Sequence, residues 1–167
     1  MMMERTGASR MERRGGHGRR AWALVAGLAL AMTVRGAHAQ EAIGPACDNR
    51  HFLAVQQAFE GGSLRGDQPV HVCGRVIAVS RQRQTRSGWH GYFYVDVGQG
   101  VSIRIVSDLD RMAAPAWPWV AKGDAVDVVG RYYYDNPRSQ GIDWTHRGTG
   151  RKWGMPGYVS VNGVRYQ

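Results

Sequence analysis

The chain has 167 residues, with 22 basic and 13 acidic side chains and a formal net charge of +9 at pH 7. This length predicts one domain, with room for a targeting segment. Much of the positive charge lies in the first 40 residues, so the basic composition does not by itself identify a nucleic-acid-binding protein.

The N-terminal segment 1–39 has the composition of a secretory signal peptide. It holds seven arginines and two acids, and its apolar run, residues 21–34, is shorter than the ~20 residues that cross a bilayer. The small-x-small sequence Ala37-His38-Ala39 follows. These features predict cleavage after Ala39 and a periplasmic or secreted protein without a transmembrane segment, with an uncleaved anchor as the alternative. Without this segment, 15 bases and 11 acids leave a net charge of +4.

The two cysteines, Cys47 and Cys73, both lie in the predicted mature chain. Thiols that meet an oxidising compartment usually pair, so the sequence predicts a Cys47–Cys73 disulfide. The alternative is two unrelated thiols. A zinc site is not indicated, because no histidine pair at ligand spacing accompanies the cysteines.

Residues 40–69 are predicted to form a linker and an amphipathic helix. Asp48 is suited to cap the helix, and Gly61-Gly62 to end it. Side chains at helical spacing define one face of the helix: Phe52, Val55, Gln56 and Phe59.

Residues 70–167 show the period-two alternation of short strands. Five strands are predicted, at 70–80, 90–97, 101–106, 125–135 and 142–146. Residues 81–88 are predicted to form a basic loop, residues 107–120 an irregular or helical insert, and Asn162-Gly163 the turn of a C-terminal β-hairpin. The expected fold is therefore mainly β, a small five-stranded OB-fold-like Greek-key barrel with an N-terminal helix. A two-sheet sandwich is the alternative.

One face of the second and third strands interleaves aromatic and basic side chains, which suits an anionic or planar ligand. The predicted ligand-binding residues are His90, Tyr92, Tyr94, Arg104, Arg75, Trp144 and His146. The basic loop would place further cations beside this face: Arg81, Arg83 and Arg86. An ordinary solvated sheet face is the alternative.

The stretch 142–146, "IDWTH", is interpreted as the last barrel strand. Alternation places Trp144 and His146 on one face and Asp143 and Thr145 on the other, so Asp143 and His146 would not form a local acid–base pair. Trp144 is expected to be largely buried, with His146 near the end of the barrel.

Catalysis and metal binding receive little support from the sequence. His90, His146 and Asp108 are weak catalytic candidates, because a dyad would need partners from different strands. Asp108 and Asp110 are interpreted as caps of a turn. No metal and no cofactor is indicated.

Several segments resemble a family of small exported bacterial proteins of unknown function whose hallmark is a His-Trp-Thr-His motif. They are "SGWHGYF" (87–93), "SDLD" (107–110), "KGDAVDVVGRYYYD" (122–135), "GIDWTH" (141–146) and "GYVSVNGVRYQ" (157–167). The motif's first histidine is Asp143 here, and a histidine and an asparagine usual before Asp108-Leu109 are absent. The resemblance implies export and kinship, and these losses weaken the expectation of catalysis.

Three functions compete at this point. The favoured one is a non-enzymatic OB-fold binding module for an anionic or planar ligand. Nucleic acid is a possible ligand, but the modest charge of the mature chain does not favour it. The second is a metal-assisted or histidine-dependent hydrolase of nuclease type. The third is a structural or protein-interaction module in which Trp117, Trp119 and the tyrosines form a partner-facing patch.

Overall fold

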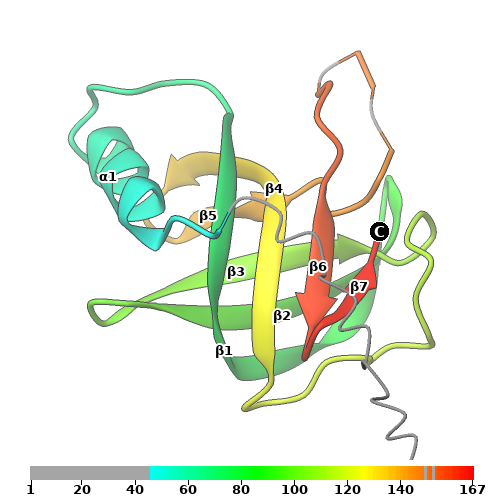
Figure 1. Ribbon diagram of the computed structural model, residues 1–167. Coiled ribbons are helices and arrows are strands. Elements are labelled where there is room, and N and C mark those ends of the chain that lie inside the picture. The colour runs from blue at the N-terminus through cyan, green and yellow to red at the C-terminus, as the bar shows by residue number, and fades with distance from the viewer. Residues whose placement is uncertain (1–45, 149, 152) are drawn as a thin grey trace, which may run out of the picture. The chain divides into compact units, whose positions relative to one another are not determined.

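The computed structural model describes residues 46–148, 150–151 and 153–167 (Figure 1). The predicted signal peptide and its cleavage site lie outside these residues. One helix and seven strands are found within them. They are α1 (Asn49–Glu60), β1 (Gln68–Thr85), β2 (Gly88–Gly98), β3 (Val101–Asp108), β4 (Ala125–Asn136), β5 (Ser139–Asp143), β6 (Tyr158–Val161) and β7 (Val164–Tyr166).

Five of the strands close into a ring, which confirms the predicted OB-fold-like barrel. Neighbouring strands follow the order β1-β2-β3-β5-β4, and β4 also pairs with β1. The β3–β5 contact, at Ile105 and Ile142, is parallel, and the other pairs of the ring are antiparallel. Strands β6 and β7 extend the sheet beyond β4 as a hairpin.

The inward side chains of the ring form the core, as the alternation of the sequence predicts. Those of β2 and β3 are Phe93, Val95, Val97, Ile103 and Ile105, all buried. The hairpin turn also matches its prediction, because Asn162 and Gly163 both have positive φ, as a type I′ turn requires.

Helix α1 packs its predicted apolar face against the barrel and lies at one end of it in Figure 1. The rings of Phe52 and Phe59 meet the Tyr132 ring edge-on, with centroids 5.2 and 5.5 Å away. The Asp48 carboxylate caps the helix by accepting the His51 N–H at 2.8 Å. The predicted disulfide between Cys47 and Cys73 is present, with Cα atoms 5.7 Å apart, and it joins the start of the helix to β1.

Strand β1 is longer than predicted, and the expectation of a basic loop at 81–88 is wrong. The strand continues to Thr85 and pairs with β2 as far as Thr85–Gly88, which leaves only a tight turn between them. Irregularities between Val76 and Ala78, and between Ser80 and Arg83, shift the register. These bulges bend the strand, so Ala78 is exposed although simple alternation predicts it inside.

The bounds of strand β5 also differ from those that alternation predicts. It spans Ser139–Asp143 and ends before the predicted stretch 142–146 is complete. Trp144 adopts a positive φ of 51°, which breaks the alternation. Ile142, Thr145 and His146 are consequently all buried, whereas Trp144, expected to be largely buried, is half-buried.

The insert between β3 and β4 contains turns and no helix within the described residues. Trp117 and Trp119 are partly buried against the core, and the Trp117 indole N–H donates to the Ser80 carbonyl at 3.0 Å. These two tryptophans are therefore only partly exposed. In the part of the chain that the structure describes, no helix combines the length and apolar character needed to cross a membrane.

Candidate functional site

The predicted aromatic–basic face of β2 and β3 is present, and strand register fixes its layout. Tyr94 lies opposite Arg104 and His90 lies opposite Asp108. Because opposite residues of paired strands point to the same side of the sheet, these side chains share one face. One hollow lies near the middle of this face, and another lies at the end that carries His90.

The first hollow, here called the tyrosine–arginine groove, has a volume of about 140 Å³. Its lining residues are Ser80, Arg83, Tyr92, Tyr94 and Arg104. No acidic side chain is among these residues. The unpredicted extension of β1 positions Arg83 here, so a cation expected on a loop is instead held on a strand.

Arg104 is the better-fixed cation of the tyrosine–arginine groove. Its Nη2 donates to the Tyr133 hydroxyl, and its Nε is buried without a hydrogen-bond partner among the described residues. Burial raises the pKa of Tyr133, against the opposing effect of the Arg104 charge. A buried guanidinium N–H without a partner is energetically costly.

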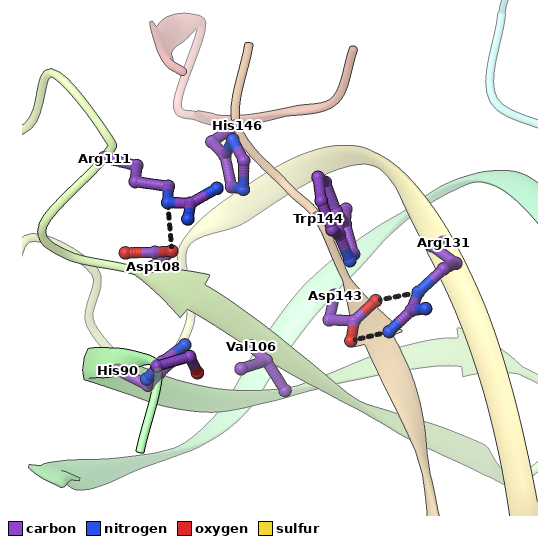
Figure 2. A pocket seen from close by; sticks show the side chains of 9 residues that line it. His90, Val106, Asp108, Arg111, Arg131, Asp143, Trp144 and His146 are labelled. Atoms are coloured by element: carbon purple, nitrogen blue, oxygen red, sulfur yellow. Dashed lines mark hydrogen bonds and ion pairs between the residues drawn. The ribbon is translucent and has the colours of Figure 1, made fainter. Parts of the chain in front are cut away.

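The second hollow, here called the histidine pocket, has a volume of about 370 Å³. Figure 2 shows its side chains around a common space at the ends of β2, β3 and β5. It is lined by Ser87, His90, Val106, Asp108, Arg111, Arg131, Asp143, Trp144 and His146. The three weak catalytic candidates of the sequence therefore meet in one pocket.

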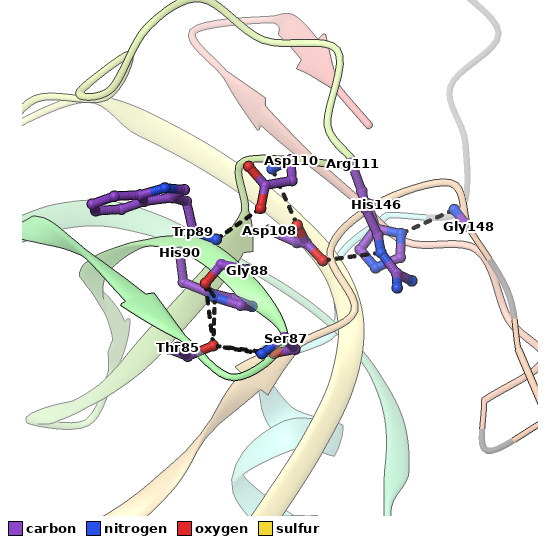
Figure 3. A network of polar contacts seen from close by, with 10 residues as sticks. All are labelled: Thr85, Ser87, Gly88, Trp89, His90, Asp108, Asp110, Arg111, His146 and Gly148. Carbon is purple, nitrogen blue, oxygen red and sulfur yellow. Dashed lines mark hydrogen bonds and ion pairs between the residues drawn. The ribbon is translucent and has the colours of Figure 1, made fainter.

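His90 is oriented by the turn between β1 and β2 (Figure 3). Its Nδ1 lies 3.0 Å from the Gly88 carbonyl oxygen and 3.2 Å from the Thr85 hydroxyl. A carbonyl oxygen only accepts hydrogen bonds, so Nδ1 carries the hydrogen. The other ring nitrogen of the neutral imidazole, Nε2, therefore bears a lone pair.

His146 is held in the opposite tautomer. Its Nδ1 accepts the Gly148 N–H at 3.0 Å, so in the neutral ring the hydrogen is on Nε2 (Figure 3). The residue is 3 % exposed. Burial lowers the pKa of His146, with Arg111 and His90 acting in the same direction and Asp108 and Asp143 opposing them. His146 is thus a neutral donor at neutral pH.

The two arginines of the histidine pocket are already paired. Arg131 makes a two-pronged contact with Asp143, from Nε at 2.7 Å and from Nη2 at 2.6 Å, and a third bond to Asp67 at 2.7 Å. These contacts raise the pKa of Arg131 further. Arg111 Nε lies 3.3 Å from Asp108 Oδ2. Two cations and two carboxylates therefore compensate each other in this pocket.

The Trp144 ring lies close to both His146 and Arg131. Its ring centroid is 5.3 Å from that of His146 and 5.9 Å from the Arg131 guanidinium carbon. Positive φ is unusual for a bulky side chain, and such strained residues cluster at functional sites.

The structure separates some of the predicted site residues. Tyr92, Tyr94 and Arg104 line the groove, and His90, Trp144 and His146 line the pocket. Arg75 lines neither of the two hollows, because its Nη1 donates to the Gly123 carbonyl at 2.9 Å.

Sequence reasoning missed Arg131, Asp143 and Arg111 as pocket residues. Arg131 and Asp143 could have been found from the predicted antiparallel pairing of the strands that carry them, which places them opposite each other. Their approach to β3 depends on the parallel contact between β3 and β5, for which the sequence has no local signal.

No group of three or more His, Cys, Asp or Glu side chains suited to a metal ion occurs among the described residues. Comparisons of the chain with family models, with curated proteins and with solved structures give no match.

Proposed function

We propose that the protein is an exported binding protein for a small planar anion, which is held in the tyrosine–arginine groove. The observation that carries the proposal is the combination of Arg83 and Arg104 with two tyrosines and no acid among the lining residues. Export rests on the signal-peptide composition of residues 1–39, on the resemblance to an exported family and on the disulfide.

The groove suits an aromatic ring that carries a carboxylate or phosphate group. Tyr92 and Tyr94 offer ring surface for contact with a planar group, and arginine pairs with planar anions through its fork of N–H donors. The small volume favours one ring over an extended polymer.

An adjoining hollow supports the same ligand class. It shares Tyr94 and Arg104 with the groove and adds Arg138, again without an acid among its described lining residues. A substituent of the ligand could extend in that direction. By contrast, the compensated charges of the histidine pocket give an anion little net attraction.

The test is an NMR titration of the purified oxidised protein with benzoate and phenyl phosphate, with benzamide as the uncharged control. Both anions are expected to shift the amide signals of β2 and β3, less so at high salt because the attraction is electrostatic. Arg83→Gln is expected to weaken binding about 10-fold, since hydrogen bonds to charged groups contribute about 1.5–3 kcal/mol. The matched control is Arg81→Gln, which removes the same charge from an exposed neighbour that does not line the groove.

The proposal is overturned if benzamide binds as tightly as benzoate, or if Arg81→Gln and Arg83→Gln weaken binding equally. The first result would mean that no charge is recognised. The second would mean that only the overall charge of the protein attracts the anion.

A further inference from the structure

The two imidazoles that line the histidine pocket are held in complementary tautomers. His90 Nε2 has a lone pair because Nδ1 donates to Gly88, and His146 Nε2 has a hydrogen because Nδ1 accepts from Gly148. Each tautomer is fixed by the main chain, which orients the ring as well. Acyl hydrolysis uses a general base and a neutral hydrogen-bond donor to the oxyanion, and this pocket is lined by one candidate for each.

We propose that the histidine pocket is a hydrolytic site for small uncharged carboxylic esters, with His90 as the general base and His146 as the hydrogen-bond donor to the oxyanion. This activity is additional to anion binding and uses none of the residues that line the tyrosine–arginine groove.

The reaction needs only water and the ester. His90 Nε2 takes a proton from water while the water oxygen bonds to the carbonyl carbon, and the π electrons move onto the carbonyl oxygen, which accepts the His146 Nε2–H bond. The carbonyl then re-forms, the carbon–alkoxy bond breaks, and the leaving oxygen takes the proton from His90. The products are a carboxylic acid and an alcohol, and both imidazoles return to their starting states.

The surroundings support these two roles. Asp108 lies directly opposite His90 on the neighbouring strand, so a carboxylate stands on the same face as the proposed base. His146 is buried beside Arg111, which helps to keep it neutral and its Nε2–H available. A neutral imidazole that polarises a carbonyl is an established use of a histidine whose pKa is lowered.

The substrate class follows from the charge and size of the pocket. Its two arginines are paired with Asp108 and Asp143, so a charged ester gains no net attraction. The volume of about 370 Å³ lies at the lower end of the range for small-molecule sites and accommodates a short acyl and alkoxy group. Val106 supplies an apolar patch on the wall.

Asparagine substitutions separate the catalytic roles from the structural ones. The side-chain amide of asparagine reaches where the histidine Nδ1 lies, so His90→Asn can still donate to Gly88 and His146→Asn can still accept from Gly148. Both variants lack any group at Nε2. The matched control is His51→Asn, because His51 is exposed on α1 and lies outside the pocket.

The assay is saturable hydrolysis of p-nitrophenyl acetate by the purified oxidised protein. His90→Asn and His146→Asn are each expected to lower kcat by about 100-fold or more, with His51→Asn unchanged. Long-range ¹H–¹⁵N NMR of the unmodified protein is expected to show Nδ1–H for His90 and Nε2–H for His146. Melting temperatures within a few degrees of the unmodified protein would exclude loss of folding.

The proposal is overturned if hydrolysis does not saturate with substrate, or if His51→Asn lowers it as much as His90→Asn does. It is also overturned if NMR shows the reversed tautomers, with the hydrogen on Nε2 of His90 and on Nδ1 of His146. Arg83→Gln distinguishes the two proposals, because it is expected to weaken anion binding and to leave ester hydrolysis unchanged. Either proposal can therefore fail in these experiments without the other failing.

Discussion

At the scale of single residues, buried polar groups hold the segment that follows β5. The Thr145 hydroxyl donates to the Val106 carbonyl at 2.9 Å, and the His146 carbonyl accepts the Gly157 N–H at 2.8 Å. These bonds satisfy polar groups that burial would otherwise leave without partners. They also fix the His146 backbone, so the position of its ring depends on contacts with β3 and with the chain before β6.

The pKa of His146 predicts a loss of stability in acid. Above about pH 6.5 the ring is neutral in both the folded and the unfolded chain. Below that pH the unfolded chain binds a proton that the folded chain resists, because burial lowers the pKa of His146 when folded. The free energy of unfolding therefore falls as the pH drops from about 6.5 toward the folded pKa.

Urea denaturation at pH 5 and pH 8 tests this prediction, with His146→Asn as the comparison. The variant has no titrating ring and keeps an acceptor for the Gly148 N–H. Its stability is expected to fall less between the two pH values than that of the unmodified protein. Identical losses would show that His146 does not contribute to the acid sensitivity.

At the scale of elements, the barrel strands approach closely at glycines in β1 and β4. A Cβ on Gly130 would lie 2.5 Å from the Asp143 carbonyl oxygen and 2.8 Å from Ile142 Cγ2. A Cβ on Gly74 would collide with the Asp96 carbonyl oxygen. The absence of a side chain at these positions therefore lets neighbouring strands pair around the tight ring.

Substitution Gly130→Ala is expected to lower the free energy of unfolding by about 1–3 kcal/mol, because the added methyl group must displace backbone and core atoms. It is also expected to move Asp143 and so to disturb the histidine pocket. Gly154→Ala is the control, since a Cβ there meets nothing within 4 Å. Urea denaturation of the two variants measures the difference, and equal stabilities would contradict the close-packing account.

Elements whose signals are local were predictable from the sequence. The helix 49–60 has its cap, apolar face and terminal glycines within one stretch, and the Asn162-Gly163 turn is encoded by two residues. The extension of β1 over residues 81–85 was not predictable, because these residues are polar and are ordered by pairing with β2. The end of β5 was missed because it depends on the positive φ of Trp144, a conformation that a tryptophan side chain does not favour.

At the scale of the whole molecule, the disulfide links the helix to the barrel. It joins Cys47 and Cys73, which are 26 positions apart, and the Asn49 side chain reinforces the link by bonding the main chain of Cys73 in both directions. A loop of this length restricts the unfolded chain substantially.

Replacement of both cysteines by serine is expected to lower stability by about 3.5 kcal/mol on the chain-entropy model. For a domain of this size the melting temperature would fall by on the order of 10 °C. Thermal unfolding of the double variant, compared with the oxidised and the reduced protein, provides the measurement. Equal melting temperatures of the reduced and the oxidised protein would contradict a stabilising role of the disulfide.

The sequence by itself determined the mainly β fold, the N-terminal helix, the hairpin and the aromatic–basic face of β2 and β3. Each of these follows from periodicity or turn chemistry within a short stretch. Only the tertiary structure decided how that face divides into two hollows. The closure of the barrel brings β5 beside β3, and β5 ends before Trp144, whose positive φ interrupts the alternation ahead of His146. The meeting of His90, Asp108 and His146 is therefore set by contacts between residues far apart in the chain, which local patterns do not record.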